Sequence, residues 1–124
     1  MPDRRGREHH FERLADALRE EIGAILEGEL ADPRIGLASV SEVQLSPEGR
    51  SARVIVIVPG DDQQAEESMK GLMSARNFIR REVGERLHLR HAPELFFQLD
   101  RSEEYQSRIE KLLARTRKRK RSSG

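Results

Sequence analysis

The chain contains no cysteine and few aromatic residues, and each scarcity excludes a class of site. Without cysteine there can be no disulfide, no thiolate nucleophile and no cysteine-based zinc site. Aromatic residues are 4% of the 124 positions, so the core must be modest and mainly aliphatic. A large enzyme-style cavity is hard to accommodate, and a reducing cytosol is compatible with this composition.

Long apolar runs are also missing. The longest, Val54 to Val58, is far shorter than the roughly 18 residues that a membrane-spanning helix needs. The polar N-terminus has no apolar signal region. We therefore expect a soluble cytoplasmic protein with no membrane partner.

Charge is abundant, at 36% of residues, and is unevenly distributed. Residues 1–7 carry three Arg and one Asp, and residues 115–121 carry six Lys or Arg and no acid. The body between them has 14 basic and 21 acidic residues, a formal charge of −7. This pattern predicts a basic N-terminal arm (1–7), one domain (8–114) and a disordered basic tail (115–124), with a polyanionic partner reached partly through the ends.

The first half of the domain reads as a helix and a hairpin. Apolar residues recur every three or four positions from His10 to Leu30, which predicts a helix that ends before Pro33. Residues 37–45 alternate as a strand does, except for a slip between Val40 and Val43 that predicts a β-bulge. Residues 46–49 have turn chemistry. The next strand has one apolar face, formed by Ala52, Val54, Val56 and Val58.

The second half reads as helix, kink, helix, strand and helix. Asp61 or Asp62 can cap a helix, and a sharp kink is predicted at Ser74, Ala75, Arg76 and Asn77, because Asn tolerates a left-handed backbone. Residues 94–99 form the third strand, and residues 100–103 have capping-box spacing for a last helix. The expected apolar face of the kinked pair is Ala65, Met69, Leu72, Met73, Ile79, Val83 and Leu87. That of the last helix is Tyr105, Ile109, Leu112 and Leu113.

The predicted class is therefore α+β: a single domain whose three-stranded sheet is packed on helices, in the order α-β-β-α-kink-α-β-α. This order resembles a type II KH domain, an RNA-binding fold. Four stretches resemble the ribosome-binding factor A family in particular: Asp32 to Ile35, Ser74 to Arg81, Pro93 to Phe97, and Asp100 to Tyr105 with Arg108 and Ile109.

The resemblance implies a bacterial, cytoplasmic, monomeric RNA-binding factor in ribosome biogenesis. It implies binding to the free 30S small subunit and its 16S rRNA, help in late rRNA processing, and special importance in the cold. We expect no catalysis, no cofactor, no metal and no small-molecule substrate. One position departs from the family pattern, since the glycine of Ala-x-Gly at the kink is Asn77 here. Asn77 is expected to supply the same positive torsion.

With the family in view, the basic residues at and after the kink are the best candidate RNA surface. Guanidinium groups stay charged and can donate paired hydrogen bonds to phosphate oxygens. The candidate residues are Arg76, Asn77, Arg80, Arg81, Arg86 and Arg90, with His88 and His91 nearby. The alternative is a solvated face balanced by Glu82 and Glu85.

The two basic ends are further RNA-binding candidates. Arg4, Arg5 and Arg7 could touch RNA where the chain enters the first helix. The tail should neutralise phosphates without reading sequence, in a salt-dependent way, through Arg117, Lys118, Arg119, Lys120 and Arg121. The alternative is a solubilising terminus.

Other conspicuous residues have structural explanations. Arg34 is expected to close the Asp32–Pro33 turn, and Arg53 to pair with Glu42 across the hairpin. Tyr105 lies on an apolar stripe and reads as a helix anchor. Adjacent His9 and His10 project in different directions from a helix and do not make a metal pair. His88 and His91 are spaced acceptably for two ligands, but no further zinc ligand is apparent.

No P-loop, nucleophile elbow or metal-ligand cluster is apparent, so an enzyme is disfavoured. The alternative function is a KH-like or ferredoxin-like protein-interaction module without a specific RNA target. It predicts RNA binding that disappears with the tail.

Overall fold

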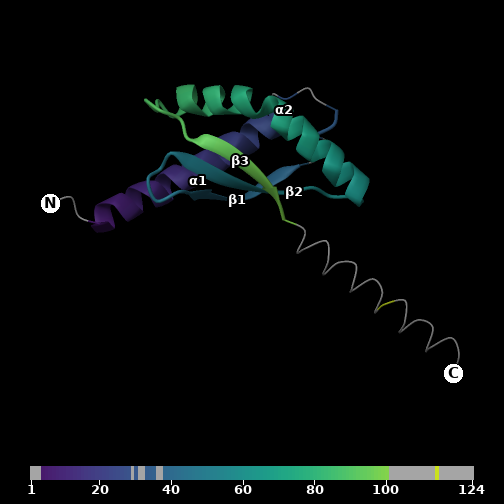
Figure 1. The fold of residues 1–124 in the computed structure, drawn as a ribbon, viewed down its shortest axis with the longest axis horizontal. Helices are drawn as coiled ribbons and strands as arrows, with labels where there is room; N and C mark the ends of the chain where they lie inside the picture. Colours follow the sequence, from purple (N-terminus) through teal and green to yellow (C-terminus); the bar gives the residue numbers. More distant parts are fainter. Residues whose placement is uncertain (1–3, 29, 31–32, 36–37, 101–113, 115–124) are drawn as a thin grey trace, which may run out of the picture.

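The computed structural model describes residues 4–28, 30, 33–35, 38–100 and 114, and the side chains from His10 onward. Two long helices pack on a three-stranded sheet (Figure 1), which confirms the predicted α+β class. The elements are α1 (Arg4–Gly28), β1 (Ser39–Leu45), β2 (Ser51–Ile57), α2 (Asp62–Arg86) and β3 (Glu94–Leu99). The sheet order is β1-β2-β3, with β1 antiparallel and β3 parallel to β2.

The predicted hairpin between β1 and β2 is confirmed in detail. The register shifts between Val40 and Glu42, where the apolar pattern predicts a bulge. The amide of Gly49 donates to the carbonyl oxygen of Ser46 at 2.9 Å, which closes the turn. Gly49 has a φ of 74°, a conformation that favours glycine. Phe11 of α1 lies directly against this turn.

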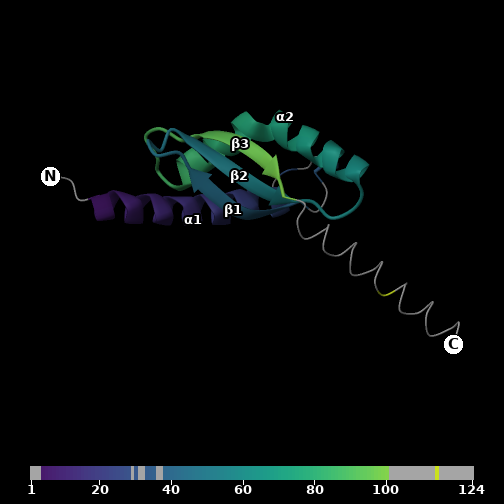
Figure 2. The ribbon, with the colours of Figure 1, turned by 60° about the horizontal axis from the view of Figure 1, so that its bottom comes forward.

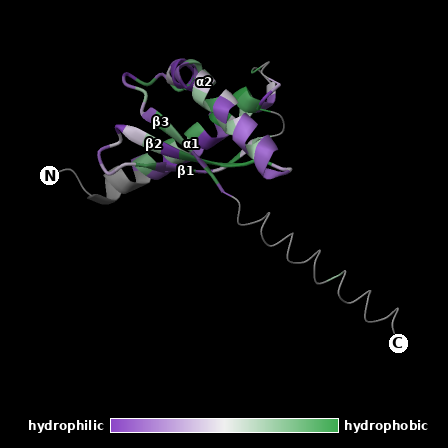
Figure 3. Cartoon of the chain, turned by 45° about the vertical axis from the view of Figure 1, so that its right-hand side comes forward, coloured by the Kyte–Doolittle hydropathy of each residue, from purple (hydrophilic) through white to green (hydrophobic). Residues whose placement is uncertain are grey.

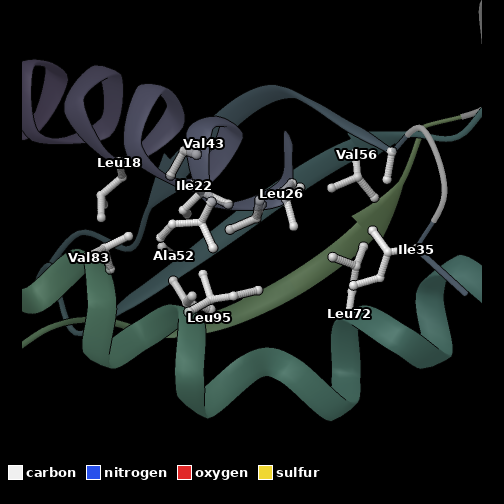
Figure 4. Close-up of a cluster of buried hydrophobic side chains, with 14 of the residues drawn as sticks. Leu18, Ile22, Leu26, Ile35, Val43, Ala52, Val56, Leu72, Val83 and Leu95 are labelled. Carbon is white, nitrogen blue, oxygen red and sulfur yellow. The ribbon is translucent and has the colours of Figure 1, made fainter. Parts of the chain in front are cut away.

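The core lies between the two helices and the inner face of the sheet (Figure 4). The inner side chains of β2, Ala52, Val54 and Val56, are fully buried, as the alternation predicts. α1 contributes Leu18, Ile22, Ile25 and Leu26, and α2 contributes Ala65, Leu72, Ile79 and Val83. Colouring by hydropathy shows hydrophilic and hydrophobic patches around α2 (Figure 3).

The outer face of the sheet is uncovered by the described helices. In Figure 2 the labelled strands are seen with no helix drawn across them. One row runs across all three strands, because Arg53 is paired with Gln44 on one side and Phe96 on the other, and all three are exposed. The predicted pairing of Arg53 with Glu42 is wrong, since the register places Glu42 opposite Ile55.

α2 differs from its prediction in one respect. The chain was expected to form two helices separated at Ser74–Asn77, but residues 62–86 form one helix, which bends along its length in Figure 1. Asn77 has ordinary helical backbone, because His88 is the only non-glycine residue with positive φ in the described chain. The exposed Met73 was wrongly assigned to the core, since it lies about 100° around the helix from the buried Leu72.

The ends of the elements agree with the sequence only in part. Asp61 caps α2, where its carboxylate accepts from the Gln64 amide at 2.8 Å and Gln64 reaches back to the Asp61 amide at 2.9 Å. α1 begins at Arg4, so the backbone of Arg4, Arg5 and Arg7 is helical. The predicted last helix and the basic tail lie outside the described residues. No helix in the described ranges is long and apolar enough to cross a membrane.

Gly49→Ala should destabilise the protein by about 1–2 kcal/mol, because Ala resists the left-handed conformation. The added Cβ would also lie 3.0 Å from the ring of Phe11. Gly23→Ala is the matched control, since a Cβ there meets nothing within 4 Å in the middle of α1. It should stabilise by roughly 0.5–1 kcal/mol. Urea unfolding of both variants checks this, and equal effects would contradict the turn geometry.

Asn77→Ala should raise the free energy of unfolding by about 0.5 kcal/mol, because Ala is the better residue in an exposed helix interior. Ser74→Ala, also exposed on α2, is the control and should behave alike. If residue 77 instead had positive φ, Ala would be destabilising there and only the control would stabilise. Thermal or urea unfolding distinguishes the two cases.

Candidate nucleic-acid interface

The C-terminal half of α2 and the loop that follows it form the site. Helical spacing places residues 77, 80, 81 and 84 on neighbouring parts of one helix face. They line an open hollow of about 760 Å³ beside the loop that connects α2 to β3. Its lining residues are Asn77, Arg80, Arg81, Gly84, Glu85, His88, Leu89 and Ala92. The structure thus gathers three predicted residues, Asn77, Arg80 and Arg81, around one concave surface.

A left-handed residue ends α2 and shapes this hollow. The amide of Leu89 donates to the Gly84 carbonyl at 2.9 Å, and the amide of His88 donates to the Glu85 carbonyl at 3.3 Å. This pair of bonds is the Schellman motif, which requires a left-handed residue after the helix. That residue is His88, with a φ of 53°. The positive torsion predicted at Asn77 therefore lies eleven positions later, at the helix end.

Arg80 fastens the loop to the helix. Its Nε and Nη2 atoms donate to the carbonyl oxygen of Ala92 at 3.1 and 2.9 Å. Gly84 allows this approach, because a Cβ there would lie 3.3 Å from the Cβ of Ala92. The side chain of Arg80 remains exposed, so its charge still faces the hollow. Arg80 is thus a structural residue whose charge also contributes to the surface.

Arg86 forms ion pairs with other residues of the protein. Its Nη1 lies 3.4 Å from Glu21 Oε2 on α1, and its Nε lies 3.6 Å from Glu82 Oε2 one turn earlier on α2. All three side chains are at most about one-third exposed, so water screens the pairs less than at an open surface. Arg86 ties α2 to α1, and its guanidinium is less available to a phosphate than the sequence indicates.

Three arginines of the predicted surface have no partner within the described part of the chain. Arg81 and Arg90 are exposed, and Arg76 is half-buried. Because none of their guanidinium donors is used internally there, these groups can bind an anion without breaking a contact of the fold. His88 and His91 are exposed nearby.

The structure does not describe the side chains of the remaining predicted residues. The side chains of Arg4, Arg5 and Arg7, and the tail residues Arg117, Lys118, Arg119, Lys120 and Arg121, lie outside the described residues. No three metal-ligating side chains converge in the described ranges. A second hollow, of about 580 Å³ at the start of α2, is lined by both acidic and apolar residues and is not a basic surface.

Sequence reasoning missed the Schellman closure and the Arg80–Ala92 contact. The only local signal was His88 itself, since His is enriched among left-handed residues relative to most side chains. The contact with Ala92 joins positions twelve apart across the loop, and no short sequence motif predicts it.

Comparison with known proteins agrees with this architecture. A family model described as ribosome-binding factor A matches residues 10–113. A ribosome-binding factor A of Koribacter versatilis is 56% identical over 121 residues, covering 98% of both chains. One from Thermomicrobium roseum is 46% identical and covers 82% of this chain and 78% of its own.

Solved structures agree as well. The crystal structure of ribosome-binding factor A from Thermus thermophilus superposes with a TM-score of 0.65 at 25% identity, over 74% of this chain and 98% of that one. The solution structure of a Thermotoga maritima protein, described as a putative ribosome binding factor A, gives 0.63 at 28% identity, over 70% and 83%. A Thermus thermophilus homology model fitted into a map of a 30S–RbfA complex gives 0.56 at 31% identity, over 76% and 94%. With a family match over most of its length and a relative identical at more than half of its positions, the chain belongs to the ribosome-binding factor A family.

Proposed function

We propose that this protein is a non-catalytic assembly factor that binds the free 30S small ribosomal subunit and assists late maturation of its 16S rRNA. A ribosome-binding factor A related in structure has been fitted into a complex with the 30S subunit. The observation that carries the proposal for this chain is the hollow at the end of α2. It is lined by two exposed arginines, Arg80 and Arg81. The protein acts as a cytoplasmic monomer, and its contribution is greatest in the cold.

Phosphate contacts dominate the proposed interface. Arg80 and Arg81 line the hollow, and Arg90 lies on the loop beside it, so one concave surface presents several positive charges. Arginine suits phosphate because its fork donates two parallel hydrogen bonds. The amide of Asn77 adds a neutral donor and acceptor at the same surface. Such a surface recognises the shape and backbone of structured RNA more than its base sequence.

The fold supports this role by keeping the hollow in one shape before RNA arrives. The Schellman bonds and the Arg80–Ala92 contact fix the loop that carries Arg90. A preformed surface loses less conformational entropy on binding than a mobile one. Arg76 contributes charge beside the hollow, and Arg4, Arg5, Arg7 and the tail add electrostatic attraction. The protein-interaction module is the alternative, and sedimentation distinguishes it.

The direct test is sedimentation of the purified protein with isolated small subunits, large subunits and complete ribosomes over a salt series. Selective binding to free small subunits at physiological salt is expected, and it should persist without residues 115–124. Indiscriminate binding that disappears with the tail would overturn the proposal in favour of the interaction module.

The double variant Arg81→Ala/Arg90→Ala should weaken small-subunit binding by about tenfold or more, since each lost charge-assisted hydrogen bond is worth about 1.5–3 kcal/mol. The unfolding free energy should change little, because neither side chain has a partner in the described structure. Arg13→Ala/Arg19→Ala is the matched control, with the same charge change at exposed positions of α1. Equal affinity losses in the two doubles would mean that net charge, and not this surface, determines binding.

Replacing residues 115–124 with a Gly/Ser segment of equal length should make log K less steeply dependent on log salt. The six basic residues between 115 and 121 would no longer release counterions from RNA. Selectivity for the small subunit over the large one should be retained. Binding measured at four or more salt concentrations gives the slope, and an unchanged slope would exclude the tail from the contact.

A further inference from the structure

One aromatic side chain, that of Phe96 on β3, lies on the outer face of the sheet and is 47% exposed. In the register of the sheet it neighbours Arg53 of β2, which in turn neighbours Gln44 of β1, and all three side chains are exposed. α1 and α2 pack on the opposite face, so no described helix covers this row (Figure 2). A single exposed ring is common on protein surfaces. The groups around this ring, however, give it a chemical use.

Phe96 lines a smaller open hollow, of about 430 Å³, where β1 ends and where β2 and β3 begin. The volume is within the roughly 300–1,000 Å³ of ordinary small-ligand sites. The polar residues of its lining are Gln44, Ser46, Ser51 and Arg53, and no acidic residue lines it. Ser46 Oγ accepts a hydrogen bond from the Ser51 amide at 3.2 Å, which holds the turn beside the hollow in place. The hollow therefore exists before a ligand arrives.

Arg53 is available to a ligand in this hollow. Within the described part of the chain its guanidinium has no hydrogen-bond or ion-pair partner. Neighbouring strands lie about 4.8 Å apart, so the guanidinium is within reach of a group that rests on the Phe96 ring. Guanidinium groups donate to phosphate oxygens and also stack on flat rings. Phe96 and Arg53 together thus suit a ligand that is a flat ring with a phosphate attached.

We propose that Phe96 and Arg53 form a subsite for one unpaired base of single-stranded RNA. The base stacks on the Phe96 ring, and Arg53 donates to the adjoining phosphate. Every base has a π-face, so stacking on an aromatic side chain tolerates any sequence. Unpaired bases are also the part of a folded RNA that can leave the helix and stack on a protein. The inference deepens the proposed function and rests on it for the source of the RNA, which is an unpaired segment of small-subunit rRNA.

Charge at this end of the sheet favours a base over a run of phosphates. Glu42 and Glu94 are exposed on the same face as Arg53, in the rows on either side of it. On the turn, Glu48 Oε2 lies 3.6 Å from Arg50 Nε, and both side chains are exposed. Two arginines and three glutamates give this end of the face a formal charge of −1, which does not attract several phosphates. A base is neutral, so it can occupy the centre of the face while a single phosphate contacts Arg53.

The subsite lies close to the basic hollow at the end of α2. Ala92 lines the basic hollow, and Phe96 follows four residues later, at most about 14 Å along the chain. The Glu94 amide donates to the Arg50 carbonyl at 2.9 Å, so the loop from the basic hollow enters the sheet beside the turn that borders the subsite. An RNA bound at the basic hollow therefore needs only a few further nucleotides to reach Phe96. The two surfaces together suit a structured RNA and the unpaired segment that leaves it.

Full-length protein carrying Phe96→Trp provides the first test, because the chain has no tryptophan of its own. A short single-stranded RNA of mixed sequence should quench the fluorescence of the introduced indole by stacking on it. A duplex of the same composition should not, since its bases are already paired and stacked. Gln63→Trp is the matched control, because Gln63 is neutral and exposed at the start of α2, beyond the opposite end of β2. Quenching at both positions, or equal quenching by the duplex, would mean non-specific association and would overturn the proposal.

Phe96→Leu should weaken binding of the same single strand by about tenfold, because it keeps an apolar side chain and removes only the aromatic ring. Arg53→Gln should make binding less dependent on salt. Its control is Arg19→Gln, at an exposed position of α1. NMR titration of each full-length variant gives the affinity, and thermal unfolding shows that the fold is retained.

Unchanged affinity of the Phe96→Leu variant overturns the proposal, and so do equal effects of the two arginine variants. The signals of Gln44, Arg53 and Phe96 should not depend on protein concentration in the absence of RNA. If they do, a second copy of the chain occupies the face, and the proposal is wrong.

Failure of this inference is distinguishable from failure of the proposed function. Selective sedimentation with free small subunits, together with no effect of Phe96→Leu on single-strand binding, would overturn the subsite alone. Stacking of single strands at position 96 without selective sedimentation would overturn the proposed function and leave the subsite standing.

Discussion

The burial of β2 is the constraint on which the rest of the fold depends. Its inner side chains, Ala52, Val54 and Val56, are completely removed from solvent and are flanked by a strand on each side. One neighbour, β1, is antiparallel and needs only a tight turn, whereas β3 is parallel and requires a crossover. α2 is that crossover. The basic hollow lies at its far end because a parallel third strand cannot be reached otherwise.

The same crossover explains why the loop beside the hollow is anchored to α2. α2 must stop before β3 begins, and the chain must reverse within the seven residues from Leu87 to Pro93. His88 supplies the reversal at the cost of a left-handed backbone, about 1–2 kcal/mol for a residue with a Cβ. Arg80 offsets this by holding the Ala92 carbonyl with two donors. The loop that forms one wall of the candidate interface therefore contains both a strained residue, His88, and a carbonyl held by Arg80, that of Ala92.

The features that sequence predicted well are local ones. The bulge after Val40 was visible as a slip in a two-residue period, and the Asp61 cap followed from side-chain chemistry three residues apart. Residues 94–99 were predicted as a strand because apolar residues alternate with others there, and turn-like segments lie on both sides. The failures involve partners distant in sequence. Arg86 looked like part of a basic surface because Glu21, which neutralises it, lies 65 positions away. Asn77 looked like the torsional pivot because a family pattern has glycine there, while the real left-handed residue depends on the loop to Ala92.

The arginines near the end of α2 divide into two kinds, and the division bears on how binding could be specific. Arg80 and Arg86 are fixed by internal contacts, whereas Arg81 and Arg90 are unpartnered within the described structure. Around them the body carries a formal net charge of −7, which as a whole repels a polyanion. A small basic surface on an acidic body can approach RNA in few orientations, because wrong ones bring like charges together. On the proposed function, acidity elsewhere in the chain therefore contributes to recognition by limiting where RNA can bind, while the fixed arginines keep that one surface in shape.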